Sequence, residues 1–220
     1  MVEKETPSSE PAPRRSRYIN RKPAANLLHA VNVAECLGRP LNTMVTFNFA
    51  HTACAAETES RKFELLRDNY FVPWLRRVRK GVAPSGPPTY IWVMENANGC
   101  PNAHWLLHIP KERLADLQAK LPQWLAAVTG TVYDDQAIDV RAAPKPKGAA
   151  KYMTKGIDPL YAPLYRINWS DQGEIVGNRS NFSKCLRPSV RKHLQQTGQM
   201  PPTRRIGLSS HAVRLSGATA

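Results

Sequence analysis

The run NAHWLLH, residues 102–108, carries an amide and two imidazoles at alternate positions. In a strand, alternate residues point to the same face, so Asn102, His104 and His108 would share one face. Glu95 ends the preceding apolar run TYIWVME, and a hairpin would bring its carboxylate to the same patch. Carboxylate, amide and imidazole groups are ligands for Mg²⁺ or Mn²⁺. Glu95, Asn102 and His104 therefore form a predicted metal site.

This strand also allows two other interpretations. Histidines on a half-buried strand often bond to neighbouring groups or to water and hold no ligand. Cys100, His104 and His108 could instead form a zinc site, although their spacing is not that of a zinc finger. The strand by itself does not decide between these interpretations.

The second group of chemical interest lies in the run APKPKGAAKYMTKGID. A short helix over 148–158 would place Tyr152 and Lys155 three positions apart, on one face. Residues 141–157 contain five basic side chains and no acid, and such a positive field favours loss of the phenol proton. A phenolate held against a phosphate could attack it and form a phosphotyrosine link. The alternative is that Tyr152 packs as an ordinary helix residue among solvated lysines.

The charge of the whole chain indicates a polyanionic partner. The 220 residues include 31 Lys and Arg against 17 Asp and Glu, a formal charge of +14. Such an excess indicates nucleic acid as the leading partner. Binding to ribosomal-type RNA or to an anionic membrane surface would account for the same charge. The residues predicted to bind DNA are Arg76, Arg77, Arg79, Lys80, Arg141, Lys145, Lys147 and Lys151.

The cysteines and the apolar runs predict where the protein works. Cys36, Cys54, Cys100 and Cys185 are scattered, without a CxxC pair. The first residues are polar, and no apolar run approaches the length of about 18 residues that a membrane span needs. We therefore expect free thiols, a cytoplasmic location and no membrane partner.

The hydrophobic periodicity predicts an α+β fold. Strands are expected over 43–50, 89–95, 103–109 and 137–143, with a terminal strand pair in 165–169 and 174–177. Helices are expected over 23–38, from residue 57 with a break at Pro73, over 111–130 and over 148–158. This order predicts an antiparallel central sheet with helices packed on one face, as in ferredoxin-like and RNA-recognition domains. The face with the histidines would be open and polar.

The same composition predicts one domain between two tails. Residues 1–22 mix Pro, Ser, Glu and Arg and are expected to form a disordered basic arm. Residues 23–198 would form the single folded domain, and 199–220 a mobile tail.

Taken together, MVTFNF, NAHWLLHIP and YMTK resemble the motifs of the HUH endonucleases, which include rolling-circle replication initiators, relaxases and transposases. In that family, a His-hydrophobic-His strand binds a divalent metal and a following helix carries the nucleophilic tyrosine, often as Tyr-x-x-Lys. The segment VGNRSNFSKCLRPSVRK also resembles the basic closing segment of bacterial replication-associated members. The resemblance covers roughly residues 40–195. It implies Tyr152 as the nucleophile and Lys155 as its assistant.

The resemblance also implies a function. It predicts sequence- or structure-specific nicking and rejoining of single-stranded or hairpin DNA through a 5′-phosphotyrosine intermediate. The setting would be rolling-circle replication of a plasmid, phage or mobile element, with Mg²⁺ or Mn²⁺ as cofactor and a host helicase as a further partner. Asn102 stands where the family has its first histidine, and His104 corresponds to the second. The alternative is therefore a catalytically weakened, DNA-binding replication or regulatory protein on the same fold. RNA binding ranks last, because it needs stacking aromatics on the exposed face.

Overall fold

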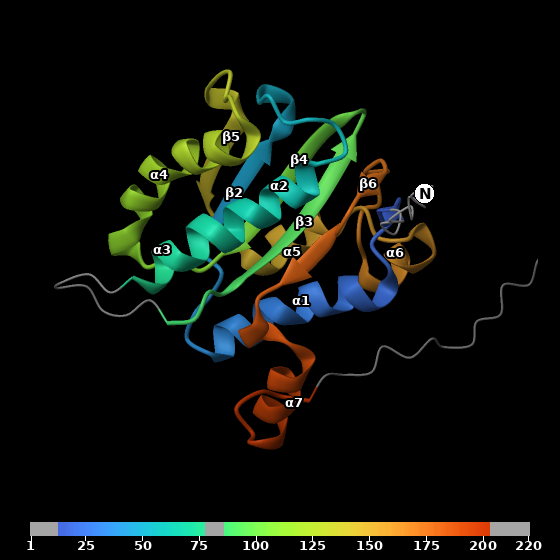
Figure 1. The fold of residues 1–220 in the computed structure, drawn as a ribbon. Helices are drawn as coiled ribbons and strands as arrows, with labels where there is room; N and C mark the ends of the chain where they lie inside the picture. The colour runs from blue at the N-terminus through green and yellow to red at the C-terminus, as the bar shows by residue number, and fades with distance from the viewer. Residues whose placement is uncertain (1–12, 78–85, 203–220) are drawn as a thin grey trace, which may run out of the picture.

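The centre of the fold is a five-stranded antiparallel sheet with the strand order β5-β2-β4-β3-β7 (Figure 1). The computed structural model describes residues 13–77 and 86–202. The strands of the sheet are β2 (Thr43–Asn48), β3 (Tyr90–Ala97), β4 (Cys100–Leu107), β5 (Ile138–Ala142) and β7 (Ser180–Phe182). The predicted α+β class with an antiparallel central sheet and packed helices is confirmed.

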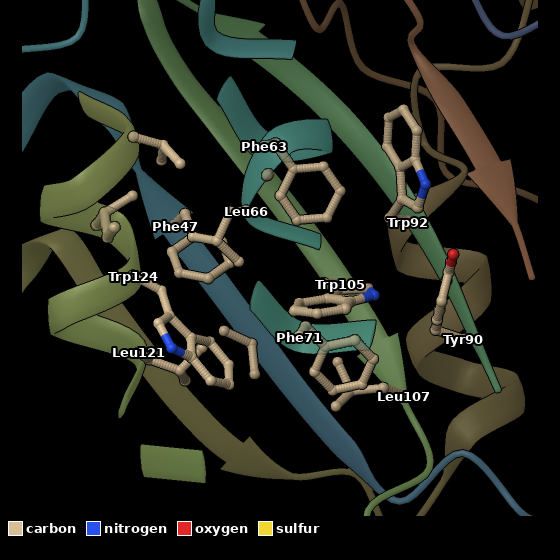
Figure 2. Packing of buried hydrophobic residues seen from close by; sticks show 14 of the residues in the cluster. Phe47, Phe63, Leu66, Phe71, Tyr90, Trp92, Trp105, Leu107, Leu121 and Trp124 are labelled. Atoms are coloured by element: carbon tan, nitrogen blue, oxygen red, sulfur yellow. The ribbon is translucent and has the colours of Figure 1, made fainter. Parts of the chain in front are cut away.

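One face of the sheet is covered by α2 (Glu59–Leu65), a π-helical turn (Leu66–Phe71), α3 (Val72–Arg76) and α4 (Lys111–Thr129). The core between these helices and the sheet is rich in aromatic rings (Figure 2). Trp105 is fully buried there, with ring centroids 4.4 Å from Phe71 and 5.4 Å from Phe63. Trp105 and Leu107 therefore point to the helix-covered side, as strand alternation predicts.

The predicted break at Pro73 is wrong, because helical residues run without a gap from Glu59 to Arg76, with a π-helical turn in the middle. The π-helical turn Leu66–Phe71 comes directly before α3, and Pro73 lies in the first turn of α3. Proline has no N–H to donate, and the π-helical turn ahead of it changes the backbone hydrogen-bond pattern at this point without ending the helix.

A second layer of helices covers part of the opposite face. It contains α1 (Arg21–Cys36) and α5 (Pro146–Met153), with α7 (Pro188–Gln196) packed against α1. Ile91, Val93 and Leu106 of the sheet are buried in this second core together with apolar residues of α1. The prediction that the histidine face is open is therefore wrong over most of its length, because α1 buries a broad apolar stripe against it. Polar side chains gather on this face at one end of β3 and β4.

A tight turn fixes the pairing of β3 and β4. The two strands extend to Ala97 and Cys100, which leaves Asn98 and Gly99 as the turn, with φ angles of 55° and 74°. Asn-Gly is the sequence that such left-handed hairpin turns favour. Cys100 therefore belongs to a strand and not to the loop that the sequence predicts.

The predicted arm over residues 1–22 differs from expectation where the structure describes it. Strand β1 (Arg15–Ser16) pairs with β6 (Ile175–Val176), and Ile19 is buried. Residues 13–22 are thus part of the fold, and residues 174–177 pair with them and not with 165–169. Residues 1–12 and 203–220 lie outside the described residues.

The remaining short helix, α6 (Ala162–Tyr165), follows α5 along the chain. In the two described ranges, no helix has both the length and the apolar character needed to cross a membrane.

Candidate functional site

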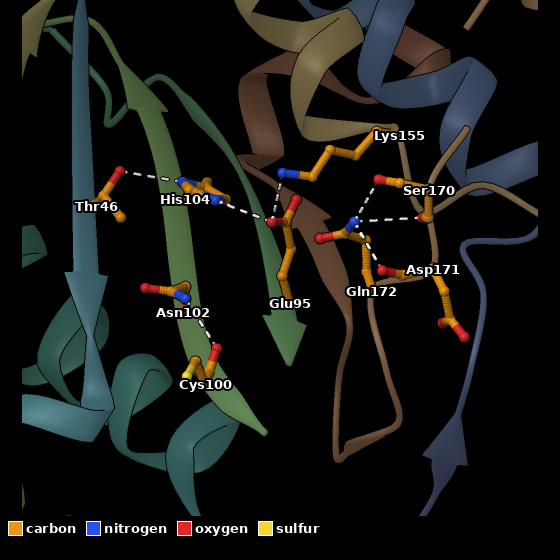
Figure 3. Close-up of polar contacts among 9 residues, drawn as sticks. All are labelled: Thr46, Glu95, Cys100, Asn102, His104, Lys155, Ser170, Asp171 and Gln172. Atoms are coloured by element: carbon orange, nitrogen blue, oxygen red, sulfur yellow. Dashed lines mark hydrogen bonds and ion pairs between the residues drawn. The ribbon is translucent and has the colours of Figure 1, made fainter. Parts of the chain in front are cut away.

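Four of the predicted site residues approach one another at the polar end of the second face. Glu95 comes from β3, His104 from β4, and Tyr152 and Lys155 from α5 and the residues after it. The Nε2 atom of His104 lies 3.0 Å from Oε2 of Glu95, and the Nζ atom of Lys155 lies 2.9 Å from the same oxygen (Figure 3). His104 and Lys155, which are 51 positions apart in the sequence, therefore share one carboxylate.

The sheet register places the carboxylate and the imidazole. Val93 is paired with His104, and Glu95 with Asn102, so all four side chains belong to one face. Further along this face towards the start of β3, apolar side chains pack under α1. Glu95 and His104 lie just past that apolar region, at its polar border.

The end of α5 places the tyrosine and the lysine. Ala150 and Met153 are fully buried, which leaves Tyr152 between them on the outer side, 56% exposed. The helix ends at Met153, and the N–H of Lys155 donates to the Tyr152 carbonyl at 3.1 Å. This turn brings the Lys155 side chain back under the phenol. Lys155 lies beyond the helix, but the predicted proximity to Tyr152 holds.

Thr46 orients the imidazole, a role that sequence reasoning missed. Its Oγ1 lies 3.0 Å from Nδ1 of His104, and the two residues are paired across β2 and β4. The contact fixes the ring and turns Nε2 towards Glu95. Only the pairing of β2 with β4 brings Thr46 and His104 together, and the sequence does not state that pairing.

Glu95 and Lys155 stay ionised although both are largely shielded from water. Burial raises the pKa of Glu95, but the hydrogen bond and charge of His104 and the charge of Lys155 outweigh it, so the pKa is lowered. Burial lowers the pKa of Lys155, but its interactions with Tyr152 and Glu95 outweigh that effect, so the pKa is raised. At neutral pH the site holds a carboxylate beside an ammonium.

The phenol of Tyr152 lies between a cation and an imidazole. The Nζ atom of Lys155 is 3.9 Å from the centroid of the Tyr152 ring. The ring of His104 meets Tyr152 edge to face, with centroids 5.8 Å apart. Because Lys155 stays protonated, it cannot accept the phenol proton, and its contribution is positive charge.

Asn102 does not join the other predicted metal ligands. Its Nδ2 donates to the Cys100 carbonyl at 2.8 Å, and its carbonyl oxygen points away from Glu95 (Figure 3). Glu95 and His104 supply one carboxylate and one imidazole, and Oε1 of Glu95 is buried without a hydrogen-bond partner among the described residues. These two groups are of the types that Mg²⁺ or Mn²⁺ binds, and an ion held by both would have to replace the contact between Nε2 of His104 and Glu95. Within residues 13–77 and 86–202, no three or more His, Cys, Asp or Glu side chains gather as metal ligands.

The zinc interpretation has no support in the described residues. The sulfur of Cys100 contacts the Asn98 carbonyl, and Nδ1 of His108 donates to the Pro40 carbonyl at 2.8 Å. His104 is engaged by Thr46 and Glu95. The three proposed zinc ligands therefore have separate partners.

The predicted DNA-binding residues are spread over both faces. Lys151 precedes Tyr152 on α5 and is exposed, and Lys145 is exposed at the start of that helix. Lys147 pairs with Glu35 at 3.2 Å, and Arg141 with Asp139 at 2.7 Å. Arg76 and Arg77 are exposed at the end of α3, on the opposite layer. Arg79 and Lys80 lie outside the described residues.

A segment that sequence reasoning did not connect to the site lies against Glu95. Gln172 is 4% exposed and lies beside Glu95 in Figure 3. Arg179 is buried nearby, and its Nη2 donates to the carbonyls of Ser16 and Gly173. Burial lowers the pKa of Arg179 to about 10, although the charge of Glu95 opposes the change. Arg179 occurs in the basic closing segment, but nothing in the sequence indicates that it is buried.

In comparisons with known proteins, no family model matches this chain and no curated protein matches it. The resemblance to HUH endonucleases therefore stays a prediction.

Proposed function

We propose that the chain is an HUH-type endonuclease that nicks and rejoins single-stranded DNA in rolling-circle replication, with Tyr152 as the nucleophile. One observation carries the proposal: the shielded ammonium of Lys155, itself paired with a buried carboxylate, lies 3.9 Å from the centroid of the exposed Tyr152 ring. A phenol that must become a phenolate benefits from this arrangement, because a nearby ammonium stabilises the negative oxygen.

The proposed reaction begins at the Tyr152 oxygen. The Tyr152 oxygen attacks a backbone phosphorus as its O–H bond breaks, and the bond from phosphorus to the 3′ oxygen breaks. The 5′ phosphate stays on the tyrosine, and the released 3′ oxygen takes a proton from water. Rejoining reverses these steps. Because Lys155 is protonated and the pKa of Glu95 is lowered, the phenol proton leaves to solvent, which the exposure of Tyr152 permits.

Glu95 and His104 would hold the divalent cation. A bound Mg²⁺ or Mn²⁺ would polarise the phosphate and stabilise charge on its oxygens. Thr46 keeps the imidazole of His104 in place for that role.

A second candidate is favoured by the contacts of Asn102 and Lys155. Asn102 donates to Cys100, and Lys155 already neutralises Glu95, so a metal would be held by few ligands. On these grounds the alternative is a DNA-binding replication or regulatory protein with little cleavage.

The test is formation of a covalent adduct. Labelled single-stranded DNA that carries the protein's own candidate replication origin is incubated with the protein and Mn²⁺. The mixture is then separated under denaturing conditions. We expect a shifted band that Tyr152→Phe abolishes and that Tyr133→Phe, a control at another exposed tyrosine, retains. A band that survives Tyr152→Phe overturns the assignment of the nucleophile. Tight binding with no band from the wild type selects the second candidate.

A further inference from the structure

Trp169 differs from the other four tryptophans of the chain. Trp74, Trp92, Trp105 and Trp124 are buried at 8% exposure or less, whereas Trp169 is 42% exposed. An indole that stays in water forgoes the stabilisation that burial of its large apolar surface would give. Such a ring commonly serves recognition, because it offers a rigid flat surface.

The backbone that carries Trp169 passes beside the candidate site. The N–H of Ser170 donates to the carbonyl of Lys155 at 3.2 Å. Two residues further on, the carbonyl of Gln172 accepts from the N–H of Asn96, the neighbour of Glu95, at 2.8 Å. Figure 3 shows Ser170 and Gln172 next to Lys155 and Glu95. Trp169 therefore lies at the margin of the site, on the side of Lys155.

This backbone is held firmly on both sides of the indole. Ile167 is buried before it and Gln172 after it. Salt bridges from β1 and the residue after it hold the next part of the segment, Arg17 to Asp171 at 2.6 Å and Arg15 to Glu174 at 2.8 Å. A ring presented from a fixed backbone loses little conformational entropy when it binds a flat partner.

The chemistry around Trp169 suits a nucleic-acid strand. Exposed Arg166 lies three residues before it, and exposed Lys151 precedes Tyr152 on α5. Basic side chains hold the backbone phosphates, while an aromatic ring stacks on an unpaired base. Stacking does not read sequence, because every base has a flat face.

We propose that Trp169 stacks on an unpaired nucleobase of the single-stranded DNA beside the phosphate that Tyr152 attacks. This inference rests on the proposed function for the identity of the strand. Stacking does not itself require cleavage, so the two can fail separately.

The test uses the fluorescence of tryptophan. A thymidine oligonucleotide is titrated into the full chain while indole emission is recorded. We expect the emission to be quenched, because Trp169 is the exposed indole. In Trp169→Phe the quenching disappears and the affinity changes by less than about twofold, since phenylalanine also stacks. In Trp169→Ala the affinity, measured with a labelled oligonucleotide, falls by about 5- to 150-fold.

Two controls separate stacking from charge and from general disturbance. The same strand with abasic sugars keeps its phosphates and should not quench. Tyr133→Ala removes an aromatic ring of similar exposure from another loop and should leave the affinity unchanged. Quenching that persists in Trp169→Phe, equal quenching by the abasic strand, or equal losses in Tyr133→Ala and Trp169→Ala would each overturn the inference. Tighter binding of a uridine than of a thymidine oligonucleotide would overturn the choice of DNA.

Tyr152→Phe distinguishes the two proposals. The oligonucleotide should quench the emission of this variant as it does that of the wild type, because Trp169 is still in place. Quenching without any covalent adduct from the wild type would refute the nuclease and keep the stacking site. An adduct that forms normally in a protein without Trp169-dependent quenching would refute the stacking site alone.

Discussion

The ammonium of Lys155 lies 2.9 Å from the carboxylate of Glu95, and their side chains are only 16% and 4% exposed. The contact joins the segment after α5 to strand β3, so it links the tyrosine-bearing helix to the sheet. A shielded ion pair contributes little when intact, yet loss of one partner is costly, because the other charge stays buried. The stability of the fold and the charge beside Tyr152 therefore depend on the same pair.

Glu95→Gln should destabilise the protein at neutral pH by about 1–3 kcal/mol, because Lys155 and His104 lose a charged acceptor. The pKa of Glu95 is lowered by folding, so its stabilisation is present above the ordinary value of 4.5 and is lost as pH falls through the lower folded pKa. Urea unfolding from pH 7 to pH 3 measures the effect. The two proteins should differ at pH 7 and converge at the acid end. A difference in unfolding free energy that stays constant from pH 7 to pH 3 would contradict the assignment of this stabilisation to the ionised Glu95 carboxylate.

Lys155→Met should lower the rate of adduct formation by about 10²-fold, because it removes the positive charge beside the phenolate. The pKa of Lys155 is raised, so the ammonium persists below 10.5 and is lost only as pH rises through the higher folded value. Single-turnover rates on labelled DNA measure the loss. Lys155→Arg is the matched control and should retain most of the rate. If Met and Arg variants are equally slow, the charge is not what matters.

Asn102→His should strengthen metal binding, because residue 102 is paired directly with Glu95 and would add an imidazole on the same face. We expect Mn²⁺ affinity to rise about 10- to 100-fold, the range over which single changes around a metal site act. Calorimetric titration with Mn²⁺ measures it, and the adduct should increase in parallel. Asn102→Ala removes the bond to Cys100 without adding a ligand and is the control. Unchanged Mn²⁺ affinity in Asn102→His would place the metal elsewhere.

Local patterns predicted much of the fold. The alternation in TMVTFNFA, the hairpin expected between the strands over 89–95 and 103–109, and the apolar stripes of the helices correspond to β2, the β3–β4 hairpin, α1 and α4. These features are local, because side-chain period and turn geometry act over a few residues. The two ends of the fold were not predicted, because they depend on contacts between segments far apart in the chain. There β1 pairs with β6, and β7 pairs with β3.

The site was predictable by residue type but not by contact. The spacing in YMTK is enough to bring Lys155 to Tyr152, and strand alternation places His104 on its face. Strand register brings Thr46 to the site, and the segment that passes beside Glu95 brings Gln172 and Arg179. A single sequence does not reveal either contact. For the same reason, the sequence did not indicate that Asn102 would bond to Cys100 and that Lys155 would engage Glu95.

Trp105→Ala should destabilise the fold by about 3–5 kcal/mol, the usual cost of removing a large buried aromatic side chain. Its ring is fully buried and contacts four other rings, those of Phe47, Phe63, Phe71 and Tyr90. Urea denaturation followed by circular dichroism measures the change. Leu160→Ala, at a side chain 76% exposed, should stay within about 0.5 kcal/mol of the wild type. Equal effects of the two substitutions would mean that this aromatic cluster is not the main core.

Gly173→Ala should lower the melting temperature and also weaken the quenching of Trp169 by DNA. Gly173 has a φ of +64°, and a Cβ atom there would collide with the carbonyl oxygen of Asn96. Alanine must therefore push the segment away from β3, at a cost of about 1–3 kcal/mol. Gly148→Ala, inside α5, is the control: its Cβ would meet the Cβ of Lys145 at 3.9 Å, an ordinary contact, and it should stabilise by about 0.5–1 kcal/mol. If Gly173→Ala melts like the wild type, the segment is not held against β3, and Trp169 is not presented from a fixed backbone.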